Sequence, residues 1–358
     1  MDEHRLLVDA FSELLADHFD IQSVHSAETE GLPERGWNAV AGGGFPWISI
    51  DEASGGSGGS LDEAFALVPL LGRYAVPLPV VESGLLAGWL CAGAGLPVDQ
   101  AVHQTVSEAG GGLAVEDLPG GGVRVAGLLP AVPWASTADT VVAVTEPGRL
   151  VLALPRDEVE IVPRYSLAGE PRDDVLVDGL VLGPDSCGQS PLTDPNGQLR
   201  RRGALVRALQ MAGALERASE ITIEYAKTRE QFGRPIARFQ AVAHELAQMA
   251  EEVALATAAT AVAARMYAAD EPGADSAVAM CKIVAGRSSR TVGKIAHQVH
   301  GAIGTTREYQ LHLFTRRLWT WTDEFGSETW WAEEFGRRMA TEGPTRHWET
   351  VTSGPRSG

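Results

Sequence analysis

The sequence predicts an α+β protein with an N-terminal helical domain, a middle β-barrel or β-sandwich domain and a C-terminal four-helix bundle. Three observations favour this fold class. Apolar residues recur at helical spacing early in the chain, short β-branched runs follow, and long Ala-rich amphipathic segments fill the remainder. We expect the domains to cover residues 1–104, 105–190 and 199–345.

The composition is that of a globular protein with an acidic surface. The 358 residues include 29 Lys and Arg against 47 Asp and Glu, which gives a formal net charge of −18. This excess of acid argues against binding to nucleic acid or to an anionic membrane. The three cysteines are far apart, which excludes a disulfide framework or a cysteine zinc site. Because the sequence shows no signal-peptide pattern and no long apolar run, we expect a cytoplasmic protein.

The first domain is predicted from apolar helical faces. Residues 1–19 place Leu and Phe at three- and four-residue steps along one face. Ser60, followed by two acids, is a typical helix start, and we expect a helix over 61–71 that ends at Gly72. A further short apolar helix is expected over 83–92.

The middle domain is predicted from short runs rich in β-branched residues. Gly, Pro and Asp separate these runs at the spacing of an all-β unit. The expected strands are 123–125, 140–145, 150–154, 160–162 and 175–181. A turn-rich linker over 184–196 then leads into the last domain.

The last domain is predicted to be helical almost throughout. Long amphipathic helices are expected over 203–227, 239–269 and 274–300, and shorter ones over 309–319 and 328–339. Long helices with short Gly/Pro breaks between them are typical of an antiparallel bundle.

One motif of this bundle is a basic turn between two helices. It consists of Arg229, Glu230, Gln231, Phe232 and Gly233, and more arginines follow. Such a turn can present an arginine and backbone amides to an anion such as a diphosphate. An ordinary helical hairpin, whose arginines cap carbonyls or pair with acids, has the same pattern.

A second motif follows the third long helix and contains Gln298, His300 and Gly301. Its glycines allow a close approach of the backbone to a ligand, or they merely end the helix. The histidines at 244, 297 and 300 do not have metal-ligand spacing with acids, so we expect core or interface histidines and no metal site.

Together the two motifs resemble the C-terminal domain of the acyl-CoA dehydrogenases, flavoenzymes that oxidise the α,β-bond of acyl thioesters. The domain order resembles theirs over nearly the whole chain, and the stretch from Gly58 to Pro79 is similar to their first domain. The resemblance implies FAD as cofactor, an acyl-CoA as substrate and a subunit interface at which one chain contacts the FAD of its neighbour.

The resemblance also implies which residues make that contact. Arg229 would neutralise the FAD diphosphate, and Gln298 with the backbone of Gly301 would lie near the adenylate half. Gln231 and Phe232 complete the set of cofactor-binding residues.

The sequence departs from the family at the catalytic base, a Glu that removes the α-proton while the flavin takes hydride from the β-carbon. Counting from Gln298 places Phe325 at one family position for this Glu. Asp323 and Glu324 lie beside it and would serve as the base after a shift of one or two residues; otherwise they form a solvated acidic turn. The family's other position falls near Gly203, where the sequence has no acid.

The segments that hold the flavin ring in the family also depart from its pattern. Thr105–Leu113 keeps an acid and glycines, but not the Thr-Glu-Pro-x-x-Gly-Ser-Asp pattern. The family's Trp-Ile-Thr falls on Ala131–Pro133, and Pro133 has no amide hydrogen to donate.

These retained and missing parts lead to one main hypothesis. The chain is the non-catalytic or half-site subunit of a heteromeric acyl-CoA dehydrogenase, and a second subunit supplies the flavin-ring pocket and the Glu. In the family, such complexes are associated with actinobacterial breakdown of steroid acyl-CoA thioesters. The alternatives are a homodimeric or homotetrameric enzyme with Glu324 or Asp323 as a displaced base, and a flavin-free structural or binding homologue.

Overall fold

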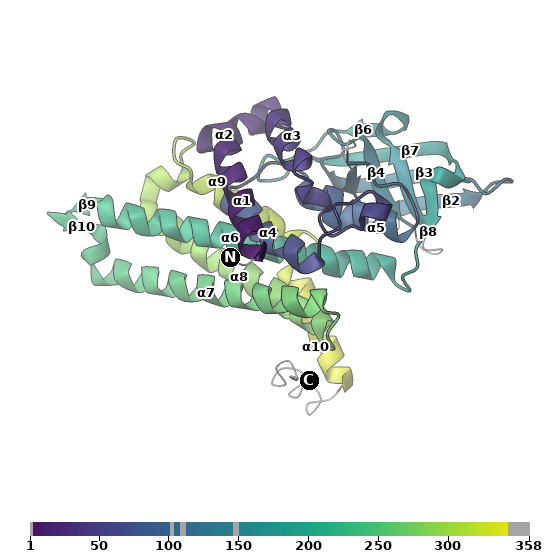
Figure 1. Cartoon of the computed structure of the whole chain (residues 1–358). Helices are drawn as coiled ribbons and strands as arrows, with labels where there is room; N and C mark the ends of the chain where they lie inside the picture. Colours follow the sequence, from purple (N-terminus) through teal and green to yellow (C-terminus); the bar gives the residue numbers. More distant parts are fainter. Residues whose placement is uncertain (1–2, 101–103, 108–111, 146–149, 343–358) are drawn as a thin grey trace. The chain divides into compact units, whose positions relative to one another are not determined.

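In a computed structural model, which describes residues 3–100, 104–107, 112–145 and 150–342, helices and sheets occur in the predicted order (Figure 1). The fold class is therefore confirmed, with N-terminal helices, a middle β domain and a C-terminal helical domain. By its internal contacts the chain divides into two units, Met1–Val206 and Arg207–Gly358. Each unit is described by itself.

The first unit begins with helices. They are α1 (Glu3–His18), α2 (Ile21–Glu30), α3 (Glu34–Gly42), α4 (Leu61–Arg73) and α5 (Trp89–Gly93). The predicted start of α4 is confirmed: the Ser60 hydroxyl accepts a hydrogen bond from the Glu63 amide, and the Glu63 carboxylate accepts one from the Ser60 amide. The sequence does not predict α2 and α3, which are short and each bury few apolar side chains.

The predicted helix over 83–92 has a different geometry. Val81–Gly88 forms a π-helical segment whose residues are all buried, and α5 continues from it. Arg202, near the start of α6 (Pro195–Thr228), donates from Nε to the carbonyl oxygen of Leu85 at 2.6 Å and lies over the ring of Trp89. This arginine therefore stabilises the interior of the first unit.

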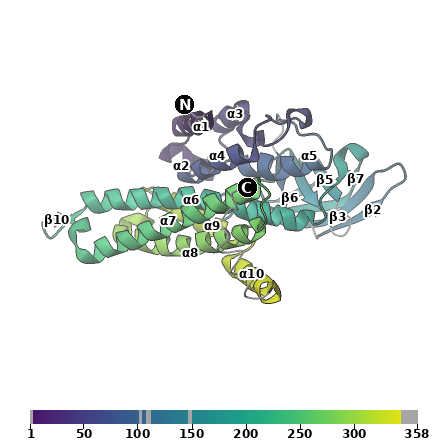
Figure 2. The same ribbon diagram turned by 60° about the horizontal axis from the view of Figure 1, so that its bottom comes forward.

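Two four-stranded sheets form the middle domain (Figure 2). One contains β1 (Gln104–Val106), β4 (Thr140–Val144), β5 (Leu150–Pro155) and β8 (Cys187–Gln189), in that order. The other contains β2 (Leu113–Asp117), β3 (Val123–Pro133), β7 (Arg172–Leu182) and β6 (Glu160–Val162). β1 runs parallel to β4, and the other pairs are antiparallel.

The two sheets share one hydrophobic core. Val125 and Val175 from one sheet and Leu152 and Leu154 from the other are fully buried in the same cluster. Alternate residues of a strand point to opposite faces, so each sheet covers the core with one face. The sequence predicts five of the strands and misses β1, β2 and β8, which are short. The strand expected over 123–125 is longer than predicted, because β3 continues through two register shifts.

The second unit contains the rest of α6, then α7 (Gln240–Ala268), α8 (Ala274–His300), α9 (Leu311–Asp323) and α10 (Glu328–Glu342). A short hairpin, β9 (Glu230–Gln231) and β10 (Arg234–Pro235), joins α6 to α7. The three long helices lie side by side in both views (Figures 1 and 2). Within the described residues, none of these helices has the length and apolar character that crossing a bilayer requires.

Candidate active site and cofactor contacts

The predicted basic turn is an exposed two-stranded hairpin. Arg229 follows the last turn of α6, and its carbonyl oxygen accepts a hydrogen bond from the Ile236 amide at 2.8 Å. Phe232 and Gly233 form the tip with φ of 50° and 76°, a left-handed conformation that suits a tight hairpin turn. The Phe232 side chain is 92% exposed. Arg229 and Phe232 are therefore both accessible to solvent on this hairpin.

The second motif is the C-terminal end of α8. Gln298 is exposed on the last turn, and Gly301 follows the helix with φ 63° and ψ −141°. A Cβ added to Gly301 would meet no atom within 4 Å, so its backbone is accessible from that side. This conformation strongly favours glycine, because other residues rarely adopt positive φ.

An aromatic cluster brings the two motifs together. Tyr225, four residues before Arg229, stacks on His300 with ring centroids 4.4 Å apart. Its hydroxyl donates to the His300 carbonyl oxygen at 3.4 Å. Tyr309 bonds through its hydroxyl to His300 Nε2 at 3.1 Å. The base of the hairpin is thus attached directly to the end of α8, a connection that the sequence did not predict.

The histidines in this region are neutral at pH 7. Burial lowers the pKa of both His297 and His300 below the ordinary value for histidine. His300 Nδ1 donates to the Ala296 carbonyl oxygen at 2.7 Å, so Nε2 is left as the acceptor for Tyr309. Permanent positive charge therefore comes from arginine and lysine side chains. Of the histidines expected in the core or at an interface, His300 is buried and His244 is exposed.

Gln298 borders a surface groove of about 480 Å³ between α8 and α9. The residues lining it are Arg290, Gly293, Lys294, His297, Gln298 and Trp319. The indole of Trp319 stacks on His297 with ring centroids 5.7 Å apart, and His297 Nδ1 is a buried polar atom without a hydrogen-bond partner. Basic side chains beside an aromatic side chain suit the phosphate groups and the ring systems of a dinucleotide.

The turn between α9 and α10 contains both candidate bases. Asp323 is exposed at the end of α9, whereas Glu324 is only 5% exposed. Glu324 accepts a hydrogen bond from Arg207 Nε at 2.6 Å, and Arg207 Nη1 donates to Gln210 Oε1 at the same distance. The interpretation of these acids as a solvated turn is therefore wrong for Glu324, because a counter-charge from α6 makes its burial possible.

Phe325, which the count from Gln298 places at the family's position for the catalytic Glu, lies inside this turn. It is 1% exposed and has φ 54°, and its carbonyl oxygen accepts from Trp331 Nε1 at 2.9 Å. The buried Lys282 side chain donates to the carbonyl oxygens of Trp321 and Thr322 at the end of α9. Groups from α6, α8 and α10 thus fix the conformation of this turn.

The segment expected behind the flavin ring is held by two carboxylates of β7. Asp173 accepts from the Ser136 amide at 2.8 Å, and Asp174 accepts from the Ala131 amide at 3.0 Å. Ala131 and Trp134 both have positive φ, 53° and 58°. These positive φ values show a strained backbone. The segment does not have the family's Trp-Ile-Thr sequence, and Pro133 has no amide hydrogen to donate. Of the expected flavin loop, residues 108–111 lie outside the described part of the chain.

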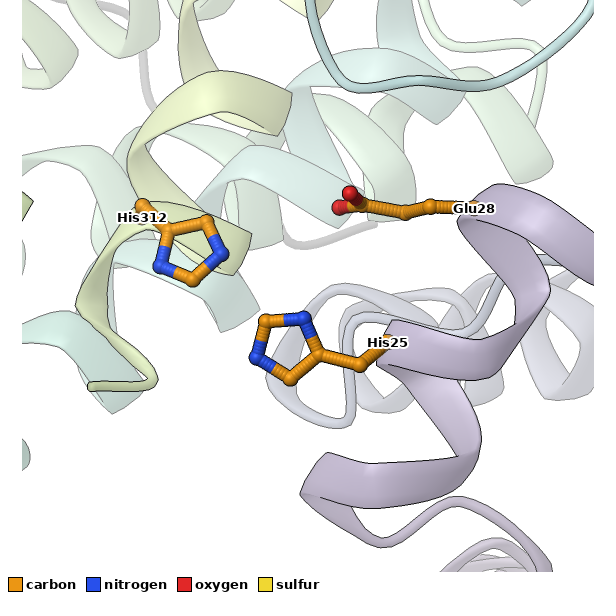
Figure 3. Close-up of side chains that lie close together, drawn as sticks. All are labelled: His25, Glu28 and His312. Carbon is orange, nitrogen blue, oxygen red and sulfur yellow. The ribbon is translucent and has the colours of Figure 1, made fainter. Parts of the chain in front are cut away.

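Two residues of α2 have side chains of the kinds that bind metals. His25 and Glu28 lie one turn apart and extend from the same side of the helix (Figure 3). Two ligands are too few for a protein metal site. The third side chain of Figure 3, His312, belongs to the other unit, where its Nδ1 donates to the Tyr309 carbonyl oxygen at 2.7 Å. We therefore assign no metal site to these residues.

The chain is similar to known acyl-CoA dehydrogenases. A family model described as the acyl-CoA dehydrogenase C-terminal domain matches residues 201–328. The acyl-CoA dehydrogenase IpdE2 of Mycobacterium tuberculosis is 29% identical over 327 residues, which are 88% of this chain and 91% of that protein.

Solved structures share the fold. A chain of the ChsE4–ChsE5 complex from M. tuberculosis superposes with a TM-score of 0.85 and 23% identity, over 96% of this chain and 98% of that one. A variant of the Tcur3481–Tcur3483 steroid ACAD gives a TM-score of 0.84 and 23% identity, over 95% and 98%. The chain belongs to the acyl-CoA dehydrogenase family of flavoprotein oxidoreductases, as the resemblance of its two motifs implied.

The buried pair predicts a specific pattern of stabilities. Replacing either partner alone, Arg207→Leu or Glu324→Leu, should lower the free energy of unfolding by about 3 kcal/mol, because the remaining charge is buried without its partner. Replacing both should recover most of that loss, since apolar side chains pack in the same space. Urea denaturation of the two single variants and the double variant measures these differences.

The exposed pair Arg337–Glu334 provides the control. Glu334→Leu should change the unfolding free energy by less than about 1 kcal/mol, as expected for a solvated pair. If Arg207→Leu and Glu324→Leu lower the free energy of unfolding no more than Glu334→Leu does, the account of Arg207 and Glu324 as a buried ion pair is contradicted.

Proposed function

We propose that the chain takes part in FAD-dependent α,β-dehydrogenation of an acyl-CoA thioester as one subunit of a heteromeric complex. It would complete the FAD site of a partner subunit, and the partner would supply the flavin-ring pocket and the catalytic carboxylate. The substrate class we propose is a steroid-derived acyl-CoA.

One asymmetry within the second unit carries the proposal. The position that the sequence count assigns to the family's catalytic Glu holds a buried phenyl ring, Phe325, which has no group that can remove a proton. Glu324 beside it is paired with Arg207 in the interior. By contrast, all the residues expected to reach a neighbour's FAD are exposed, namely Arg229, Gln231, Phe232, Gln298 and Gly301.

The relatives support a heteromeric assembly. ChsE4–ChsE5 is described as a complex, and the Tcur3481–Tcur3483 structure is described as a steroid ACAD. Both cover nearly the whole of this chain. We extend the partner type and the substrate class from those proteins to this chain as part of the proposal.

The exposed residues suit the cofactor roles that the family implies. FAD, when bound, accepts the hydride from the β-carbon. Arg229 would bind the diphosphate, because the N–H groups of a guanidinium match two phosphate oxygens. The Gln298 amide and the accessible backbone of Gly301 would hold the adenylate half. The nearby histidines His297 and His300 are neutral at pH 7 because burial lowers their pKa values. The binding of FAD should therefore not depend on their protonation above pH 7.

A homomeric enzyme with its own displaced base is the alternative, and one observation favours it. Asp323 is exposed at the end of α9, so its carboxylate is accessible to solvent. Glu324 is the weaker candidate of the two, because its carboxylate is buried against Arg207. In this alternative the chain would bind FAD and turn over acyl-CoA without a second type of subunit.

Cofactor content distinguishes the two functions. Purified alone, the chain should carry little FAD and show no dehydrogenase activity, because its own flavin-ring contacts are incomplete. Co-expressed with a partner subunit of the acyl-CoA dehydrogenase family, it should purify as a yellow complex that oxidises acyl-CoA thioesters. The flavin absorbance spectrum and a dye-reduction assay measure both properties. Full FAD occupancy and activity of the chain alone would rule the proposal out.

The role of Arg229 can be tested in that complex. Arg229→Gln should weaken FAD retention by about 10- to 100-fold, since a charge-assisted bond to phosphate contributes about 1.5–3 kcal/mol. Fluorescence of released flavin measures the dissociation constant. Arg238→Gln, which removes another exposed arginine near the hairpin, is the matched control and should leave FAD binding unchanged. Equal effects of the two substitutions would show that the contact is not specific.

A further inference from the structure

The groove between α8 and α9 has an aromatic side and a basic side. Lys294 and Gln298 lie four residues apart on α8, so their side chains are neighbours on one face of the helix. Trp319 comes from α9 and is 40% exposed. The volume of about 480 Å³ is in the range of small-ligand sites. An indole ring, a side-chain amide and an ammonium group therefore line one small hollow.

The indole of Trp319 is oriented by its neighbours. It stacks on the His297 ring with an interplanar angle of 21°. His297 Nε2 lies 3.0 Å from Thr315 Oγ1, and this hydroxyl donates to the Leu311 carbonyl oxygen. The imidazole is therefore the donor to Thr315, and the contact fixes its ring plane. An aromatic surface that is already oriented loses little conformational entropy when a ligand stacks on it.

Gly293 keeps the groove open beside this indole. It lines the groove from α8, and a Cβ added to it would lie 3.6 Å from Trp319 Nε1. A methyl group would thus contact the edge of the indole, and a larger side chain would fill the space next to it. The small residue and the flat indole together leave room for a planar ring.

Lys294 supplies the uncompensated positive charge of the groove. Among the residues that the structure describes, its ammonium group has no ion pair and no hydrogen bond. Arg290, one turn earlier on α8, is paired with Glu328 at 2.5 Å, so its charge is balanced. The chain has a formal net charge of −18, and an unpaired lysine beside an aromatic ring on such a chain favours an anionic ligand.

We propose that this groove binds the adenosine diphosphate portion of a nucleotide, with the adenine ring against Trp319 and a phosphate at Lys294. Nucleobases stack on aromatic side chains, and a glutamine amide such as that of Gln298 can bond to both the N6 amino group and N7 of adenine. FAD and the CoA thioester both contain this portion, and the inference rests on the proposed function for both ligands. Trp319 and Lys294 are thus assigned a binding role that the family resemblance does not give them.

Binding of ADP to the purified chain tests the groove without FAD or CoA. Saturation-transfer NMR should detect ADP on the chain, and Trp319→Leu or Lys294→Gln should each weaken its binding about tenfold. Trp319→Phe keeps an aromatic ring and should retain most of the affinity. Arg337→Gln removes an exposed charge on α10, outside the groove, and should leave the affinity unchanged. Absence of ADP binding, or equal binding by Trp319→Leu and the wild type, would overturn the proposal.

The heteromeric complex identifies the source of the nucleotide. If the groove holds the adenylate half of FAD, Trp319→Leu should raise the dissociation constant of FAD about tenfold and leave the KM for acyl-CoA unchanged. If the groove holds the nucleotide end of CoA, the same substitution should raise that KM about tenfold while FAD is retained. A Trp319→Leu complex in which both values are unchanged would overturn the proposal.

Arg229→Gln separates failure of this inference from failure of the proposed function. If Arg229→Gln releases FAD but Trp319→Leu changes neither FAD retention nor the KM, the groove is not a nucleotide site and the proposed function stands. If the complex of unmodified chains binds no FAD, the proposed function fails. In that case the ADP titration of the purified chain still decides whether the groove binds a nucleotide.

Discussion

The buried ion pair between Arg207 and Glu324 is the constraint on which the C-terminal unit depends. Both side chains are 5% exposed, and a buried charge of either sign is tolerated only with its partner in place. The pair joins the start of the bundle to the turn between α9 and α10. As a result, the Glu324 carboxylate balances a charge inside the unit, and Phe325 beside it is enclosed.

The cofactor side of the unit is organised in the opposite way. Tyr225 and His300 attach the base of the hairpin to the end of α8, so the two exposed motifs belong to one arrangement. Burial keeps His300 neutral, and the hairpin carries the exposed cations Arg229 and Arg234. The residues proposed to contact FAD are exposed, and the position proposed for the base is enclosed, as our proposal of a half-site subunit requires.

The features that the sequence predicted are those set by local pattern. The order of domains follows from the change between helical and strand periodicity, and the turn at Gly233 follows from its place between two amphipathic helices; the two short strands β9 and β10 of this turn were not predicted. The burial of Glu324 could not be predicted, because its partner is 117 residues away and sequence spacing carries no information about such a contact. The Tyr225–His300 stack was missed for the same reason. The π-helical geometry of Val81–Gly88 was missed because an apolar run predicts a helix but not its hydrogen-bond pattern.

The central claim is that this chain supplies no catalytic carboxylate. The most direct test is anaerobic reduction of the flavin by acyl-CoA in the heteromeric complex, with Arg207→Leu, Glu324→Leu and Asp323→Asn combined in this chain. The first two changes remove Glu324 without leaving a buried charge, and the third removes Asp323. Flavin bleaching at the rate of the unmodified complex is the expected result. Loss of bleaching in a complex that still retains FAD would show that one of these carboxylates is the base.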